Sequence, residues 1–148
     1  MARIKIEFPE KFSFTASIPV RITDLNYGGH VGNDAMLSLI HEVRIQFLRH
    51  FGYEEMNIAG VGLIMSDVAI EFKNELFYGD VIEAKAAATD FSKVGFDIVY
   101  LMQTLKNQKP VTAAIAKTGM ICYDYERKKI TAVPEEVKRV LTGSNDGF

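Results

Sequence analysis

The sequence predicts an α+β fold in which one long helix packs against one face of an antiparallel sheet. A chain of 148 residues has the size of one domain, and no linker-like stretch divides it. Apolar residues recur at helical spacing over one long segment, residues 33–51, whereas most other segments alternate with the period of strands. The joints between the later strands hold only a few residues, which leaves no room for crossover helices and favours antiparallel pairing.

The first strand is predicted at residues 12–22, where apolar and polar side chains alternate. Pro19 lacks the N–H group that a central strand needs, so we expect this strand at an edge or at a bulge. The buried face of the strand would carry Phe14, Ala16, Ile18 and Val20.

A loop and a long helix follow this strand. Residues 24–32 hold three glycines and an asparagine, which is typical of a loop. Asn33 and Asp34 suit the N-terminus of a helix, and Gly52 suits its C-terminal end. A helix between these points is about 27 Å long, enough to run the length of a small sheet. Its apolar stripe consists of Met36, Ile40, Val43, Phe47 and Phe51.

Four alternating segments then predict a meander of antiparallel strands, the last of which is expected to bend near Gly119. Pro134 predicts the start of a short terminal helix that ends at Leu141. The four segments lie around residues 67–73, 82–88, 96–102 and 111–125. Small side chains that would let the long helix approach the sheet closely are Ala84, Ala86, Ala88, Ala114 and Ala116.

We expect residues 1–148 to form a single domain with an ordered core at residues 12–142.

Composition narrows the classes of function that the chain can have. The net charge of −2 provides no field that would concentrate nucleic acid or an anionic membrane. No apolar stretch approaches the roughly 20 residues that span a bilayer, and the start lacks the apolar core of a secretion signal. Because Cys122 is the only cysteine, a reducing compartment is favoured. We therefore expect a cytoplasmic protein that binds neither nucleic acid nor membrane.

The predicted sheet has surface that the single helix does not cover. Its second face still carries apolar side chains, and the long strand at residues 111–125 is expected to leave an edge open. Pairing with another copy of the chain would cover both features, so we expect a homodimer whose sheets join edge to edge.

Two segments, RITDLNYGGHVGN at residues 21–33 and HEVRIQFL at residues 41–48, resemble the opening of a known family. This family is the hotdog-fold acyl-CoA thioesterases of the 4-hydroxybenzoyl-CoA thioesterase type. The strand at residues 70–73 and the Gly-Asp turn at residues 79–80 are similar to the next part of the family pattern. The resemblance covers residues 12–134. It implies an antiparallel sheet of five or six strands wrapped around the long central helix, assembled as dimers or tetramers.

The same resemblance implies an activity and a place for it. Hydrolysis would cleave acyl-CoA or acyl-carrier thioesters to a free acid and a thiol, with coenzyme A as part of the substrate and with no metal or bound cofactor. The active site would lie between subunits, near the N-terminus of the long helix. There, free N–H groups and the helix dipole can stabilise the oxyanion that forms when water attacks a thioester carbonyl. The candidate substrate-binding residues are Tyr27, Gly29, Val31, Asn33 and Glu42.

One residue departs from the family pattern. Asn26 stands where many members carry the catalytic carboxylate, and an amide can neither take a proton from water nor attack a carbonyl as a carboxylate can. Asp34 is the candidate replacement that holds or activates the water. His30 would assist through a hydrogen bond or a proton, and Asn26 would orient substrate or water. Asp34 can equally be a solvated acid that favours the helix dipole.

Other chemistry has less support in the sequence. His41 and His50 lie on opposite faces of one helix, so together with His30 they predict no metal site. Cys122 lies on a strand without a histidine partner, which indicates a packed thiol. Two alternative functions stay open besides hydrolysis: a hydratase or dehydratase that acts on acyl thioesters through His30 and an acid, and a non-catalytic acyl-CoA-binding module.

Overall fold

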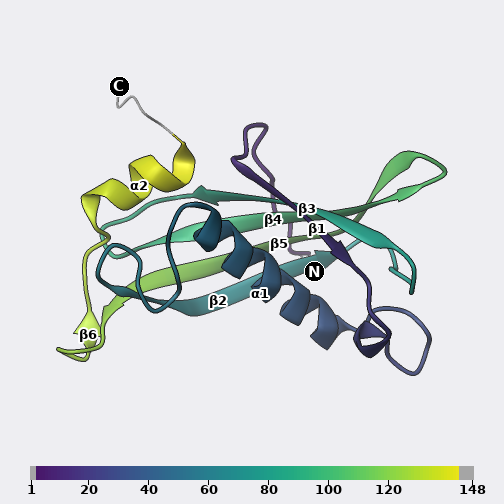
Figure 1. The fold of residues 1–148 in the computed structure, drawn as a ribbon, viewed down its shortest axis with the longest axis horizontal. Coiled ribbons are helices and arrows are strands. Elements are labelled where there is room, and N and C mark those ends of the chain that lie inside the picture. Colours follow the sequence, from purple (N-terminus) through teal and green to yellow (C-terminus); the bar gives the residue numbers. More distant parts are fainter. Residues whose placement is uncertain (1–2, 144–148) are drawn as a thin grey trace.

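A six-stranded antiparallel sheet curves around one long helix in the computed structural model, which describes residues 3–143 (Figure 1). This architecture confirms the predicted α+β fold; residues 1–2 and 144–148 of the expected domain lie outside the described residues. The strands are β1 (Phe14–Pro19), β2 (Gly62–Phe72), β3 (Val81–Thr89), β4 (Gly95–Lys106), β5 (Lys109–Asp124) and β6 (Lys129–Ile130). The helices are the 3-10 turn η1 (Ile22–Asp24), α1 (Asn33–His50) and α2 (Glu135–Thr142).

The strand order across the sheet is β1-β3-β4-β5-β2, and the short β6 pairs with β5. β3, β4 and β5 form the predicted meander, and β1, which ends at Pro19, lies at an edge as predicted. Two expectations are wrong. β2 pairs with β5 and not with its sequence neighbour β3, and β5 lies inside the sheet instead of leaving an edge open. The physical reason is that residues 73–80 form a connection long enough to carry the chain from β2, at one edge of the sheet, past β5 and β4 to β3.

The pairing of β2 with β5 has a bulge opposite Gly119, the residue near which the strand at residues 111–125 is expected to bend. The register of the two strands shifts between Met65 and Asp67, and Gly119 stands opposite Asp67. A Cβ atom at Gly119 would collide with the Asp67 carboxylate, so a residue without a side chain suits this close approach. A bulge increases the local twist, which helps β2 to follow the curve around α1.

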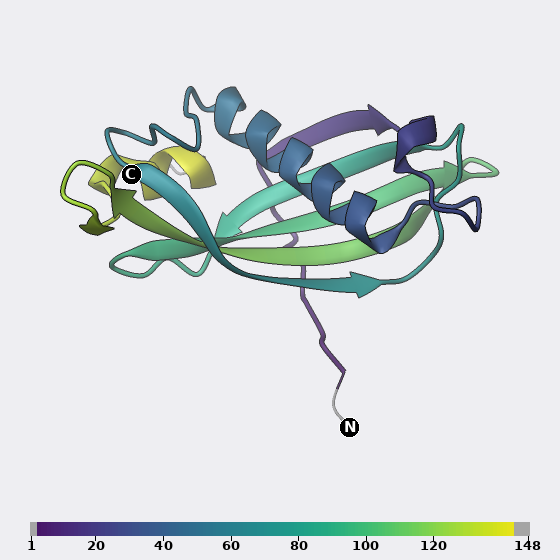
Figure 2. The ribbon, with the colours of Figure 1, turned by 90° about the horizontal axis from the view of Figure 1, so that it is seen from below.

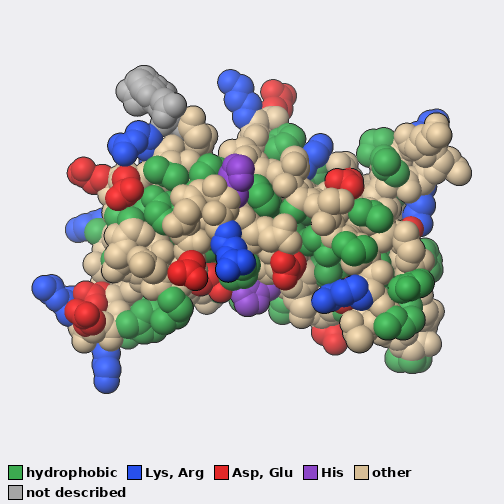
Figure 3. Space-filling view, viewed as in Figure 1, with side chains coloured by type: hydrophobic (Ala, Val, Ile, Leu, Met, Phe, Trp, Pro, Cys, Tyr) green, Lys and Arg blue, Asp and Glu red, His purple; other side chains and the backbone are tan. Residues whose placement is uncertain are grey.

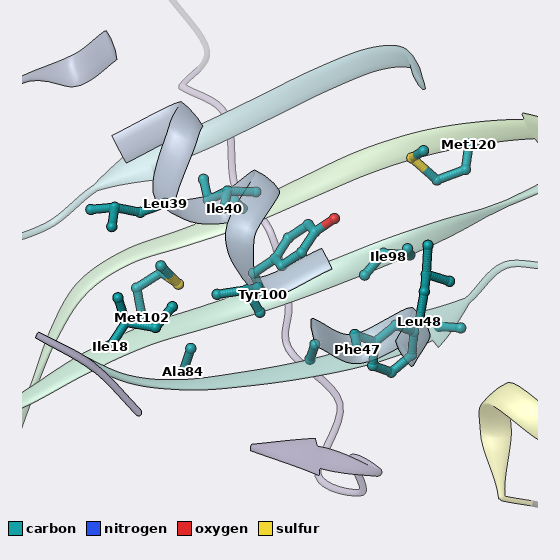
Figure 4. Close-up of a cluster of buried hydrophobic side chains, with 14 of the residues drawn as sticks. Ile18, Leu39, Ile40, Phe47, Leu48, Ala84, Ile98, Tyr100, Met102 and Met120 are labelled. Carbon is teal, nitrogen blue, oxygen red and sulfur yellow. The ribbon is translucent and has the colours of Figure 1, made fainter. Parts of the chain in front are cut away.

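The core lies between α1 and the concave face of the sheet (Figure 4). The helix buries one apolar face, which includes Ile40, Val43 and Phe47, each fully buried. Across from it, small side chains on β3 and β5 allow close packing, as predicted. Val137 and Leu141 of α2 close one end of the same core. The five predicted alanines Ala84, Ala86, Ala88, Ala114 and Ala116 all belong to this cluster.

The N-terminal segment crosses the face of the sheet opposite α1 (Figure 2). The Ile6 N–H donates a hydrogen bond of 2.6 Å to Oε2 of Glu71 on β2. The Lys85 ammonium lies 4.9 Å from the centre of the Phe12 ring. Part of the outer sheet face is therefore covered by the chain itself.

A buried polar cluster ties α1 to the loop that follows it and to the sheet. The Arg44 Nε atom donates to Oε2 of Glu55 at 2.7 Å, and Nη1 of Arg44 donates to the Tyr100 hydroxyl at 3.4 Å. The Tyr100 hydroxyl in turn shares a hydrogen bond of 2.7 Å with Oγ1 of Thr118. His41 contributes a ring nitrogen 3.0 Å from Oε1 of Glu55. Each polar group of the cluster has a partner, which is the condition for burying such groups between helix and sheet.

Candidate active site

The loop before α1 folds into a tight turn that Asn26 holds together. The Asn26 N–H donates to the carbonyl of His30 at 2.9 Å, and the Gly29 N–H donates back to the carbonyl of Asn26 at 3.1 Å. The side-chain oxygen of Asn26 accepts a hydrogen bond of 2.9 Å from the Gly28 N–H. Gly29 has a φ angle of +83°, a conformation that glycine adopts without strain. The turn therefore depends on an Asx-type hydrogen bond and one glycine.

The far side of this turn is attached to the connection between β2 and β3. The Val31 N–H donates to the carbonyl of Leu76 at 2.8 Å, and His30 forms a bridge with Phe77. The Gly32 N–H donates to the carbonyl of Asp24 at 3.2 Å, just before α1 begins. These bonds bring two segments that are far apart in the sequence against the N-terminus of α1.

A cleft of about 260 Å³ opens where the two segments meet. His30 lies at the cleft with a third of its side chain exposed, and its Nε2 atom is 2.9 Å from Oε2 of Glu75. The Nδ1 atom of His30 faces the carbonyl of Val31 at 3.3 Å, and the ring packs edge-on against Phe77. The cleft is lined by His30, Val31, Asn33, Met36, Phe72, Lys73, Asn74, Glu75 and Leu76. It combines an apolar wall with one imidazole, one carboxylate and one ammonium group.

Asn26 lies between the two predicted catalytic partners but does not line the cleft. A Cβ atom placed on Gly28 would be 3.3 Å from Oδ1 of Asn26 and 3.4 Å from Nε2 of His30, so these side chains flank Gly28. A Cβ atom on Gly32 would be 2.7 Å from Oδ1 of Asp34 and 3.4 Å from Cβ of Asn26. Asp34 therefore folds back over the start of its own helix, is exposed, and does not line the cleft that contains His30.

Several backbone N–H groups of the turn already have acceptors within the protein. The N–H groups of Gly29, Val31 and Gly32 are all taken by carbonyl groups of the protein. The α-helical bonding pattern starts with the Met36 N–H, which donates to the carbonyl of Gly32 at 2.9 Å. The first turn of α1, beginning at Asn33, thus supplies the donors that a helix leaves free at its N-terminus. Asn33 itself lines the cleft, so this donor region borders it.

Three predicted substrate-binding residues, Tyr27, Gly29 and Glu42, do not line the cleft. Tyr27 is fully exposed at the tip of the turn. Glu42 accepts a hydrogen bond of 2.8 Å from Gln46 and lines a separate, smaller hollow of about 150 Å³. Hydrophobic side chains gather at the same end of the molecule as the turn in the view of Figure 3. The exposed members of this group include Ile22, Tyr27, Phe77, Tyr78, Val81 and Leu105.

Five consecutive cleft residues, at positions 72–76, were not among the candidate site residues of the sequence. Glu75 contacts His30, Phe72 contributes an apolar surface, and Lys73 supplies an ammonium group. They lie at the end of β2 and in the connection after it, where no residue spacing signals a site. The one available signal is that this segment follows the strand in which the family resemblance continues.

Other chemistry-bearing groups lie outside the cleft. Cys122 is buried on β5, as predicted, and burial raises the pKa of its thiol to about 11. Within residues 3–143 no cluster of three or more His, Cys, Asp or Glu side chains has the arrangement of a metal site. Within the same range, no helix is both long and apolar enough to cross a membrane.

The fold and the sequence together place the chain in a known family. Residues 20–141 match the model of the thioesterase-like superfamily, and the chain belongs to this superfamily. A curated protein of Aquifex aeolicus (strain VF5), named "Putative esterase", is 28% identical over 124 residues. That alignment covers 82% of this chain and 92% of the Aquifex protein.

Solved structures agree on the architecture. The 1,4-dihydroxy-2-naphthoyl-CoA thioesterase of Synechocystis superposes with a TM-score of 0.76 at 21% identity, covering 86% of this chain and 94% of its own. A variant of 4-hydroxybenzoyl-CoA thioesterase in complex with 4-hydroxybenzoyl-CoA gives a TM-score of 0.79 at 13% identity, covering 87% and 98%. At these identities the likeness shows the fold, which is the hotdog fold. Membership of the superfamily supports thioesterase activity in general.

Proposed function

We propose that the protein hydrolyses acyl-CoA thioesters at the cleft beside His30. The observation that carries this proposal is the position of the cleft: it joins an imidazole, a carboxylate and an apolar wall to the N-terminus of α1. Membership of the thioesterase-like superfamily supports the reaction class, and the two named structural relatives are thioesterases of CoA substrates.

The N-terminus of α1 is suited to the charge that develops during hydrolysis. Attack of water on the thioester carbon turns the carbonyl oxygen into an oxyanion. The free N–H groups of the first turn, together with the helix dipole, stabilise negative charge at this point. Loss of one such donor typically raises the barrier by about 3–4 kcal/mol. The tetrahedral intermediate then expels the thiol, and the acid is released.

The cleft also suits the two parts of an acyl-CoA. Val31, Met36, Phe72 and Leu76 supply an apolar wall for an acyl group. Lys73 is the one Lys or Arg among the described residues that line the cleft, and from its exposed position it pairs with Glu71 at 3.4 Å. We assign Lys73 to a phosphate group of coenzyme A, because an exposed ammonium group that lines the cleft can meet the charged end of the substrate.

We also expect a second subunit next to the site. β2 is an edge strand of the sheet, and Phe72 at its end lines the cleft with half of its side chain exposed. A copy of the chain that pairs along this edge would stand beside the cleft and cover Phe72. This arrangement agrees with the inter-subunit site that the family resemblance implies.

Thiol release from a panel of acyl-CoAs tests the proposal directly. We expect the wild-type protein to release thiol, measured with a thiol-reactive dye, from at least one member of the panel. Asp34→Ala in the same assay tests the acid nominated by the sequence; undiminished turnover excludes Asp34 as the base. Asn26→Asp is expected to raise turnover, because it restores a carboxylate at the family position. A lower rate would show that the amide has a role of its own.

Asn26 favours one alternative, a module that binds acyl-CoA without hydrolysing it. The amide removes the usual acid of the family, while the cleft is retained. The two functions differ in one measurable way. A binding module retains acyl-CoA in equilibrium dialysis and releases no thiol across the panel, whereas an esterase releases thiol at the rate at which acyl-CoA disappears.

A further inference from the structure

Glu75 has the only carboxylate among the described residues that line the cleft. Its Oε2 atom is 2.9 Å from Nε2 of His30, and 59% of its side chain is exposed. The second oxygen, Oε1, accepts no hydrogen bond from any residue in the described range 3–143. One oxygen of Glu75 is thus in contact with the imidazole while the other is open to a ligand.

The backbone around Glu75 is held on both sides although the side chain is exposed. Before it, the Asn74 N–H and the Asn74 side chain donate to the carbonyls of Ala113 and Thr112 at 3.2 and 2.8 Å. After it, Leu76 is buried and its carbonyl accepts the Val31 N–H. The anchored backbone and the contact with His30 together restrict the position of the Glu75 carboxylate, which is what a catalytic group requires.

The surroundings of His30 leave it poorly placed to act as the base itself. Nε2 faces the Glu75 carboxylate, and Nδ1 faces the carbonyl of Val31 at 3.3 Å. Both neighbours are acceptors, so each ring nitrogen has an oxygen of the protein within 3.3 Å. Neither nitrogen is free of a neighbouring oxygen of the protein. The imidazole is instead placed to orient Glu75.

Asp34 does not share the position of Glu75 at the cleft. Its Oδ1 atom lies over Gly32, it does not line the cleft, and Asn26 stands between it and the His30 side of the turn. An acid at the start of a helix also has a sufficient structural role, because it lies favourably in the field of the helix dipole.

We infer that Glu75, oriented by His30, is the general base of the proposed hydrolysis and takes the place of the carboxylate that Asn26 cannot supply. This inference rests on the proposed function. Glu75 accepts a proton from water as the water oxygen bonds to the thioester carbon. The tetrahedral intermediate collapses with cleavage of the C–S bond, and the proton passes from Glu75 to the departing sulfur. Thioester and water thus become acid and thiol, with no other reactant.

Glu75→Gln keeps the shape of the side chain and removes its basicity. Because a positioned base contributes about a hundredfold to ten-thousandfold in rate, we expect kcat for thiol release to fall by at least about a hundredfold. KM should stay within a few-fold. Glu75→Asp should retain more activity than Glu75→Gln, because a carboxylate remains. Glu126→Gln, at an exposed glutamate in the turn after β5, is the matched control and should retain wild-type kinetics.

The outcomes separate this inference from the proposed function. Wild-type protein that releases no thiol from any acyl-CoA overturns both. If the wild type releases thiol and Glu75→Gln retains this activity, or if Glu75→Gln changes KM alone, Glu75 is not the base. Thioester hydrolysis then still stands as the function. A loss of kcat in Asp34→Asn that Glu75→Gln does not share assigns the base to Asp34. Equal thermal unfolding midpoints for all variants confirm that each measurement is made on folded protein.

Discussion

At the level of single residues, Cys122 illustrates how packing sets reactivity. It lies on β5, fully buried in the core cluster, and burial raises the pKa of its thiol to about 11. Because the thiolate is the reactive form, a thiol with this pKa is almost entirely unreactive near neutral pH. The structure thereby confirms the sequence-based interpretation of Cys122 as a packed thiol.

We therefore predict that Cys122 resists modification in the folded protein. Ellman's reagent at pH 7.5 should label about one thiol per chain in guanidinium chloride and almost none under native conditions. Cys122→Ala is the control that reports background labelling. Rapid labelling of the native protein would contradict the buried position of this side chain.

At the level of elements, the position of α1 relative to its following loop depends on Arg44 and Glu55. Arg44 is buried, and its hydrogen bond to Glu55 is 2.7 Å long. Burial by itself would raise the pKa of Glu55, but the hydrogen bonds from Arg44 and His41 outweigh burial and hold the pKa below its ordinary value of 4.5. The Arg44–Glu55 ion pair therefore stabilises the fold most when Glu55 is ionised.

Removal of one partner should destabilise the fold strongly. Glu55→Ala leaves the Arg44 charge buried without its carboxylate, and we expect a loss of about 3 kcal/mol in the free energy of unfolding. Urea denaturation at pH 7 measures this loss. The double variant Arg44→Leu with Glu55→Leu should recover much of it, because no buried charge is left unpaired. Equal destabilisation in the single and double variants would contradict this explanation.

The same pair predicts a dependence of stability on pH. A carboxyl whose pKa is lowered in the folded state stabilises the protein above its unfolded pKa, here 4.5. That stabilisation disappears as the pH falls through the lower pKa of the folded state. The free energy of unfolding of the wild type, measured from denaturation curves, should therefore fall more steeply below pH 4.5 than that of Glu55→Gln. Parallel curves would show that Glu55 does not contribute to acid sensitivity.

At the level of the whole molecule, the sheet ends at β2, which is the longer of its two edges. Only one side of β2 pairs within the chain, with β5. Met65 and Val68 on this strand are 41% and 39% exposed, so apolar side chains accompany the unpaired backbone groups. An edge of this kind is a template for pairing with another chain.

We predict a homodimer that pairs along β2. Replacing Met65 and Val68 by lysine places charges on the edge and should convert the dimer to a monomer, measured by light scattering after gel filtration. Leu105→Lys is the matched control, because Leu105 is 60% exposed at the end of β4, which does not neighbour β2 in the sheet. A wild-type monomer, or equal effects of both sets of variants, would contradict a β2 interface.

The elements and the family follow from the order of residues alone. Periodicity in residues 12–22 and 33–51 predicts β1 and α1, and the turn residues predict the meander of β3, β4 and β5. These features depend on near neighbours in the chain, whose spacing fixes which side chains share a face. The motif in residues 21–33 similarly places His30 and Asn26 in one loop, and it points to the superfamily to which the chain belongs.

Other features depend on long-range packing that no local spacing records. The pairing of β2 with β5 required the three-dimensional course of residues 73–80, and so did the contact between His30 and Glu75. These two residues are separated in the sequence and meet because the connection after β2 folds back against the turn before α1. Asp34 is close to His30 in sequence yet turns toward Gly32, because a helix start directs its side chains by its own geometry. The composition of the cleft was therefore decided by tertiary contacts, since local preferences set the conformation of a segment but not which distant segment it meets.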